Sequence, residues 1–193
     1  MKLTAYASGS TGNLYSVTDG ITSLLLEAGL PLKEMQRITQ HTLSNHDACF
    51  ITHAHRDHCE GAKDLQNTIG VPVFCSEHTA GTLDAFTIRI KAGEIKRINT
   101  IEVEPFDVKH FDQKTNEWMP TLGFHLSSTF DRESIVFITD TYYSKPRFYK
   151  PTIMAIECNY ANDLLPEDII ERPKRKLYTQ TVRLPSVFMI EKY

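Results

Sequence analysis

A histidine-rich turn at residues 52–58 constrains this chain more than any other stretch, because its side chains suit a metal ion. The pattern is H-x-H-x-D-H, and its ligand-type residues are His53, His55, Asp57 and His58. Residues two apart in an extended backbone point to the same side, so we expect His53 and His55 to face one ion. Asp57 and His58 are adjacent, point apart, and are candidates for a second ion. Imidazole with carboxylate favours zinc, iron or manganese over calcium or magnesium.

The segments on either side of the turn support this interpretation. Residues 48–51 are apolar and predict a short buried strand, and a helix is expected from about 60 to 69, ending at Gly70. The alternative is a solvated surface loop that is rich in histidine by chance. The coincidence of a strand, this spacing and a following helix disfavours that alternative.

The composition indicates an ordinary globular protein. The 193 residues are enough for one domain with a substantial core, so we expect a single domain over residues 1–193 with an atypical tail at 172–193. No apolar run approaches the ~20 residues that span a membrane, and the first residues lack the apolar core of a signal peptide. A cytoplasmic location without a membrane partner is therefore the default expectation.

Charge and cysteine usage exclude some classes. The net charge of −3 gives no global electrostatic argument for nucleic-acid binding, and the basic cluster at 172–176 is expected to be a solvated tail. The four cysteines form no C-x-x-C pair, so neither a disulfide framework nor a zinc finger is expected. Cys49 and Cys75 read as core thiols, and Cys59 is not expected to bind metal.

Hydrophobic periodicity and turn residues predict short strands and few helices. The expected helices cover residues 31–41, 60–69 and 77–85, with a further helix start at 166–171. The expected strands cover residues 2–7, 14–17, 23–27, 48–51, 72–75, 100–108, 121–127, 134–138 and 152–157. Residues 86–96 have no assignment, and a polar loop is expected at 111–120. Antiparallel opening strands followed by alternating strands and helices predict an α/β layered fold.

Further candidates for the metal cluster follow the expected strands. His110 ends one strand and Asp140 follows another, and ligand sites collect at strand ends in layered sheets. A carboxylate directly after a buried strand is costly unless it is compensated, which favours a role for Asp140. Seen alone, a histidine such as His110 is more often structural. Glu157 is a weaker candidate for a supporting group, and His125 is expected to have no role.

Four stretches together resemble one branch of a known superfamily. They are the H-x-H-x-D-H turn, the opening loop at 7–13, the strand end at 26–29 and the segment 138–141. On these residues the chain is similar to the metallo-β-lactamase superfamily, in particular to the YycJ/WalJ-like group of small metal-dependent hydrolases, related to nucleic-acid-processing members. The resemblance covers residues 2–171. It implies a four-layer αββα sandwich of the α/β (α+β) class, C-terminally incomplete in this chain.

The same resemblance implies a binuclear metal site. It assigns six ligands: His53, His55 and His110 for the first ion, Asp57 and His58 for the second, and Asp140 as a bridge between them. Two divalent ions, zinc with manganese or iron as alternatives, would lower the pKa of a water and stabilise negative charge on a phosphate or carbonyl oxygen. Asp57 is the catalytic candidate, because it would orient that water or accept its proton.

The chain departs from the family pattern near its C-terminus. The family supplies one more histidine there for the second ion, and this sequence has no histidine after His125. A truncation or changed reading frame is one explanation. Natural divergence is the other, with Cys158 or a solvent molecule as the replacement. Both explanations leave the second metal site, and hence activity, in question.

The favoured function is a metal-dependent hydrolase acting on phosphodiesters of nucleic acid, that is, a nuclease. One alternative is a metal-binding homologue with weak or no activity because of the missing histidine. Another is a small-molecule hydrolase of a lactone, thioester or β-lactam. The turn does not separate these functions, because the same two-metal centre serves all of them. The oligomeric state is not indicated.

Overall fold

The structure is a computed structural model that describes most of the chain. It covers residues 1–83, 87–112, 115–141, 143–144, 148, 150–158 and 187–192, and for 143–144, 158 and 187–192 only the backbone is described. Within these ranges, no helix is long and apolar enough to cross a membrane. The helix expected at 166–171 and the basic cluster at 172–176 lie outside the described residues.

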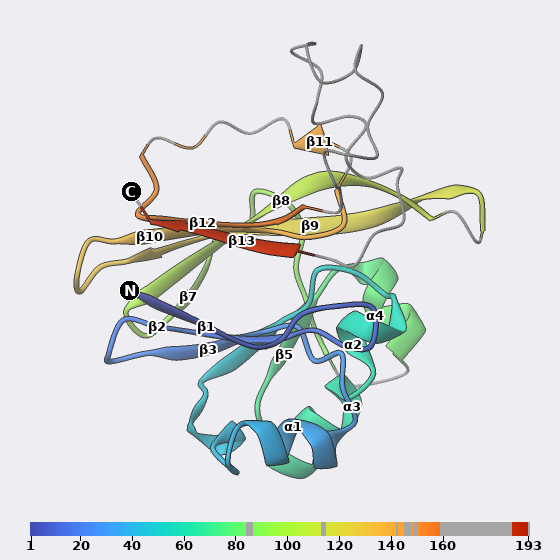
Figure 1. Cartoon of the computed structure of the whole chain (residues 1–193), viewed down its shortest axis with the longest axis horizontal. Coiled ribbons are helices and arrows are strands. Elements are labelled where there is room, and N and C mark those ends of the chain that lie inside the picture. The colour runs from blue at the N-terminus through green and yellow to red at the C-terminus, as the bar shows by residue number, and fades with distance from the viewer. Residues whose placement is uncertain are drawn as a thin grey trace.

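Two mixed β-sheets pack face to face, and the described helices cover the outer face of the first sheet (Figure 1). The first sheet runs in the order β1 (Lys2–Ala7), β2 (Leu14–Thr18), β3 (Ser23–Leu26), β4 (Ala48–Phe50), β5 (Val73–Cys75) and β6 (Ile88–Arg89). The second runs in the order β11 (Tyr143–Ser144), β8 (Ile101–Asp112), β9 (Glu117–Ser128), β10 (Ser134–Ile138), β12 (Ile153–Cys158) and β13 (Val187–Lys192), with β7 (Lys96–Ile98) beside β8. The predicted fold class is confirmed. A second helical layer would have to come from residues outside the described part, and the single-domain assignment stays a prediction.

The helices follow the predicted positions with shorter spans. They are α1 (Leu32–Ile38), the 3-10 turn η1 (Leu43–Asn45), α2 (Arg56–Cys59), α3 (Ala62–Asp64), the π-helical turn η2 (Leu65–Ile69) and α4 (Glu77–Leu83). Gly70 ends η2 with a φ of 87°, as its left-handed freedom suggests. The backbone N–H of Thr79 donates to Ser76 Oγ, so the Ser76 side chain caps the start of α4.

Side-chain alternation divides the core into two layers. On β3, Leu24 and Leu26 face the second sheet, whereas Leu25 faces the helices. Between the sheets, Phe50 stacks on Phe74 with ring centroids 4.7 Å apart and meets Phe124 of the second sheet edge-on at 5.7 Å. Full burial of each such ring contributes about 1.5–3 kcal/mol, so this layer holds the sheets together.

The hairpin of β8 and β9 corrects two expectations. Its ladder runs without interruption from Ile101↔Ser128 to Asp112↔Glu117, so most of the expected loop at 111–120 is strand and His110 lies inside β8. Pro105 does not interrupt β8, because its carbonyl accepts from Gly93 at the outer edge. The missing N–H of Pro105 therefore faces that edge and not β9.

Two strands formed where none was assigned. β6 pairs with β5 in parallel, and β7 pairs with β8, so residues 86–96 contribute to both sheets. Within the tail at 172–193, β13 pairs antiparallel with β12 from Ile153↔Lys192 to Cys158↔Val187. The tail therefore adds an edge strand to the second sheet.

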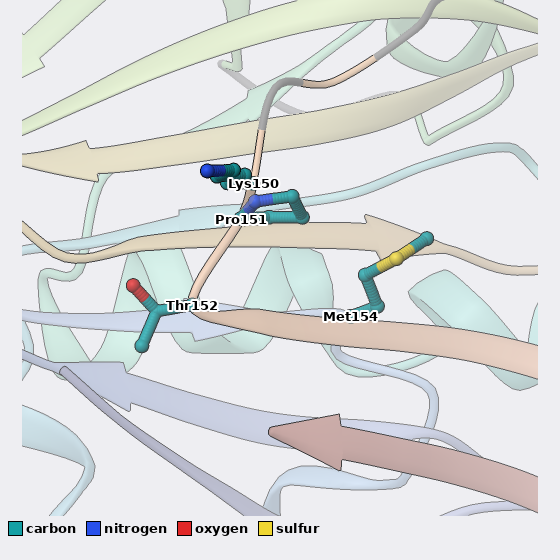
Figure 2. Close-up of a pocket in the computed structure, with 4 residues that line it drawn as sticks. All are labelled: Lys150, Pro151, Thr152 and Met154. Carbon is teal, nitrogen blue, oxygen red and sulfur yellow. The ribbon is translucent and has the colours of Figure 1, made fainter. Parts of the chain in front are cut away.

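A hollow of about 540 Å³ lies beside the start of β12 and is lined by Lys150, Pro151, Thr152 and Met154 (Figure 2). Met154 alternates with Ile153 and Ala155, which belong to the core between the sheets. The hollow is therefore on the outer side of the second sheet. The hollow lies at the N-terminal end of β12, whereas Glu157 and the histidine turn lie near the C-terminal end.

One buried carboxylate fastens the two sheets together. Asp19, in the β2–β3 turn, accepts hydrogen bonds from the backbone N–H groups of Ile21 and Thr22, and from the hydroxyls of Thr100 (2.6 Å) and Ser128 (2.7 Å) in the second sheet. Burial alone would raise the pKa of Asp19, but these hydrogen bonds outweigh it and lower the pKa to about 2.

We predict that Asp19→Asn removes a pH-dependent part of the stability. The folded pKa of Asp19 lies below its ordinary value of 3.8, so its stabilisation is present above that value and is lost as the pH falls toward 2. The shift corresponds to about 2 kcal/mol at neutral pH. Urea unfolding at a series of pH values measures it. If the Asp19→Asn variant lost stability between about pH 4 and pH 2 as the wild-type protein does, Asp19 would not be the source of this pH dependence.

Candidate metal centre

The histidine turn follows β4 directly and passes into α2. β4 lies between β3 and β5 in a parallel arrangement, so its C-terminal end opens at the same edge as theirs. His53 comes first and is buried, and His55 occupies the N-cap position of α2. Asp57 and His58 lie in the first turn of α2, which begins at Arg56 and not at the expected residue 60. A helical backbone therefore sets the directions of these two side chains.

Backbone contacts from two other segments hold the turn. The Asp57 carbonyl accepts from the Asn13 N–H at 2.8 Å and from Asn13 Nδ2 at 3.1 Å, and the His58 carbonyl accepts from the Ala28 N–H at 2.9 Å. Gly29 packs so closely that a Cβ atom would overlap the Asp57 carbonyl. The stretches 7–13 and 26–29 thus hold the histidine turn in place by backbone hydrogen bonds and close packing.

Three histidines form the first donor set. His53 Nε2 lies 3.0 Å from His55 Nδ1, and the ring of His110 lies 5.0 Å from each of their rings, centroid to centroid. One ligand atom from each of the three lies within 4.8 Å of the other two. Nitrogens bound to one tetrahedral zinc ion at 2.0–2.1 Å would be roughly 3.3 Å apart. The set is therefore close to the dimensions that one ion requires.

A second donor set shares His53 with the first. Asp140 Oδ2 lies 2.9 Å from His58 Nε2 and 3.5 Å from Nε2 of His53, the residue that the two sets share. Asp57 Oδ2 is 3.7 Å from His58 Nε2, and its side chain is 32% exposed. Five of the six predicted ligands thus belong to the two donor sets, and Asp57 lies beside His58 but outside both sets.

Asp140 adopts an unusual backbone conformation that Glu157 supports. The φ of Asp140 is 41°, in the left-handed region that residues other than glycine rarely adopt. Its backbone N–H donates to Glu157 Oε2 at 3.0 Å. β10 and β12 are parallel, with Ile138 opposite Ile156, so Glu157 stands beside the residues that follow β10. The sequence indicated Glu157 only weakly.

Glu27 is a buried residue to which the sequence analysis assigned no role. It has no exposed surface, and its Oε1 accepts from the Thr52 hydroxyl at 2.6 Å and lies 3.2 Å from His58 Nδ1. The Thr52 hydroxyl also lies 2.8 Å from His53 Nδ1. Because this hydroxyl gives its one proton to Glu27, it must accept from His53 Nδ1–H. The Nε2 lone pair of His53 is then directed into the donor sets.

The surroundings shift the pKa values of the histidines in opposite directions. Burial, with smaller contributions from the neighbouring histidines, lowers the pKa of His53 well below its ordinary value, and burial also lowers the pKa of His110. Burial would lower the pKa of His58 as well, but the carboxylates of Glu27 and Asp140 outweigh it and raise that pKa well above 6.5. The lowered pKa values favour the neutral imidazole of His53 and His110, the form that binds a metal, whereas His58 would release its proton when an ion binds.

The residues fit a divalent ion. The buried Nε2 atom of His110 has no hydrogen-bond partner among the described residues, although it belongs to a crowded polar cluster. Such an atom is costly unless a ligand satisfies it. Behind His55, the Asp112 carboxylate lies 3.4 Å from Nε2, the usual arrangement for a metal-binding histidine whose other nitrogen faces a carboxylate.

Other candidate residues lie apart from the cluster. Cys59 Sγ donates to the carbonyls of Ala54 and His55, and burial raises its pKa to about 12, so it is a packing thiol. His125 lies 3.6 Å from Glu104. His46 is buried away from the cluster, and its Nε2 lies 2.9 Å from Ser16 Oγ.

A two-sheet sandwich with a histidine and aspartate cluster at its strand ends defines a metallo-β-lactamase-type protein. Residues 17–172 match the family described as the beta-lactamase superfamily domain. The chain belongs to the metallo-β-lactamase superfamily, and within it to the YycJ/WalJ-like branch.

Two curated relatives support this placement. The chain is 28% identical over 152 residues to exodeoxyribonuclease YycJ of Bacillus anthracis, covering 73% of this chain and 54% of the relative. It is 28% identical over 159 residues to exodeoxyribonuclease WalJ of Streptococcus pneumoniae, covering 76% of this chain and 56% of the relative. The chain thus spans about half the length of these relatives.

Solved structures show the same fold. A B3 metallo-β-lactamase with an active-site glutamic acid aligns with a TM-score of 0.58 and 14% identity, covering 80% of this chain and 74% of its own. YhfI from Bacillus subtilis, a metallo-β-lactamase fold protein, aligns with a TM-score of 0.54 and 14% identity, covering 70% and 60%. At these identities the likeness concerns the fold alone.

We predict that Glu27→Gln weakens metal binding by about 10–100-fold, because the charge that orients His58 and, through Thr52, His53 is lost. Competition against a chromophoric chelator measures the affinity. The matched control is Glu34→Gln, which removes an exposed carboxylate of α1 that pairs with Arg37. Equal affinities for the two variants would exclude the orienting role of Glu27.

We predict that Gly29→Ala destabilises the protein by more than about 1 kcal/mol and weakens metal binding, because the added methyl group displaces the Asp57 carbonyl. Gly81→Ala is the control, since a Cβ at this position in α4 meets nothing within 4 Å. Thermal unfolding and metal titration of both variants test this. A Gly29 variant as stable as the Gly81 variant contradicts the close packing.

Proposed function

We propose that this chain is a metal-dependent hydrolase that cleaves phosphodiester bonds of nucleic acid at a two-ion centre. The observation that carries the proposal is the pair of donor sets that share His53, with ligand atoms within 4.8 Å of one another in each set. The names of the curated relatives, both exodeoxyribonucleases, support DNA as the substrate class. A cytoplasmic location accords with such a substrate.

Different residues of the chain would bind each ion and activate the water. His53, His55 and His110 would hold the first ion, and His58, Asp57 and Asp140 the second. Divalent ions, zinc first, with manganese or iron as alternatives, would lower the pKa of a water molecule and stabilise negative charge on the phosphate. Asp57 is more exposed than Asp140, 32% against 23% of the side chain, so it is the carboxylate that would orient that water or accept its proton.

The missing C-terminal histidine does not remove the second set. His58 and Asp140 belong to the second donor set, and Asp57, whose Oδ2 lies 3.7 Å from His58 Nε2, would add a third protein ligand, the usual number in a catalytic zinc site, with an open position left for solvent or substrate. This supports divergence with solvent as the replacement, and it argues against an inactive homologue. Cys158, the other proposed replacement, has no described side chain. The β-lactamase neighbours share only the fold and do not favour a β-lactam substrate.

The test is hydrolysis of single- and double-stranded oligodeoxynucleotides by the metal-loaded protein. We expect turnover that chelator abolishes and that Zn²⁺ or Mn²⁺ restores. His53→Ala should reduce the rate at least about 100-fold, because the first ion loses one of its three histidine ligands. His78→Ala, which alters an exposed histidine on α4, should not change the rate. Absence of cleavage by metal-loaded protein, with intact metal content, would overturn the proposal.

A further inference from the structure

The β8–β9 hairpin carries an exposed aromatic group next to the metal centre. The strands of this hairpin continue past the sheet as a two-stranded ribbon (Figure 1). On the ribbon, Phe111 pairs with Trp118, and their rings meet edge-on with centroids 5.3 Å apart. The Lys109 ammonium lies 5.7 Å from the centre of the Trp118 ring, and Trp118 is 60% exposed. We call Lys109, Phe111 and Trp118 the aromatic face.

The aromatic face and the metal ligands share one strand. His110 lies between Lys109 and Phe111 in β8, and side chains alternate along a strand, so His110 faces the other side of the ribbon. Asp112 shares that other side and lies 3.4 Å from His55 Nε2. A chain held at the metal centre can therefore reach the aromatic face by passing around the ribbon, without crossing the body of the protein.

The chemistry of the aromatic face suits an unpaired nucleotide. A solvent-exposed indole offers a flat stacking surface to any base, and the lysine over one face of the ring offers a cation to the adjoining phosphate. The hairpin's acidic pair, Asp112 and Glu117, lies on the opposite face. Among the described hairpin residues, Asp107 is the carboxylate on the same face as the aromatic group. It precedes Lys109 by two residues, on the side nearer the body of the sheet.

We infer that the aromatic face is a stacking platform for an unpaired base of a single-stranded nucleic acid whose backbone enters the metal centre. The inference rests on the proposed function and adds a substrate form to it. The protein would bind single-stranded ends or overhangs in preference to blunt duplex, and it would do so with little dependence on sequence, because every base has a stacking face.

Trp118 provides its own reporter, because it is the single tryptophan of the chain. A single-stranded oligodeoxynucleotide with hydrolysis-resistant phosphorothioate linkages should quench the tryptophan fluorescence on binding, whereas a blunt duplex should quench it less. Trp118→Ala should weaken binding of the single strand about tenfold, and Trp118→Phe should retain most of the affinity. Lys109→Ala should reduce the slope of log affinity against log salt by about 0.7, the value for one phosphate contact.

The matched control is Phe130→Ala, which removes another aromatic side chain that is 60% exposed, at the far end of β9. It should leave affinity and salt dependence unchanged. In cleavage assays, Trp118→Ala should raise KM and leave kcat unchanged, because stacking acts on binding.

The outcomes separate this inference from the proposed function. Cleavage of DNA without quenching, and with equal KM for the Trp118→Ala and Phe130→Ala variants, overturns the platform and leaves the nuclease standing. Quenching and weakened binding of the Trp118→Ala variant, in a protein that cleaves no DNA, supports the platform while the nuclease proposal fails.

Discussion

The buried carboxylate of Glu27 is the group on which the metal centre depends. It has no exposed surface, and one of its oxygens binds the Thr52 hydroxyl and faces His58 Nδ1. Burying a charge is costly unless it is fully compensated, so Glu27 is stable only with these partners in place. Through Thr52 it also fixes the tautomer of His53. A single charge beneath the turn therefore orients one ligand of each donor set.

The strand arrangement explains why such distant residues meet. Parallel pairing of β3 with β4 places the end of β3 beside the histidine turn, and parallel pairing of β10 with β12 places Glu157 beside Asp140. The two sheets bring these ends together, and Asp19 joins the sheets at the β2–β3 turn, with bonds to Thr100 and Ser128. The centre is thus assembled from five segments of the chain, and the core holds them in register.

The sequence predicted what depends on short-range pattern. The H-x-H-x-D-H spacing, the strand ends before His53 and Asp140, and the α/β layering could all be read from periodicity. The role of Glu27 could not, because its partners are 25 and 31 residues away along the chain. A carboxylate that ends the apolar Leu24–Leu26 run was the available signal, since a buried charge needs a reason. Residues 111–120 were predicted to form a loop because they are mostly polar and show no regular apolar alternation, although they form most of the ribbon.

Metal content per chain, measured by elemental analysis of protein purified without chelator, tests the central claim most directly. The donor sets around His53 and Asp140 predict two divalent ions per chain, and they predict that Asp140→Ala loses the second ion first because that set has fewer histidines. One ion per chain in the wild-type protein would contradict the second set. No bound metal would contradict the whole account of the site, because the orphaned nitrogen of His110 would then have no ligand to satisfy it.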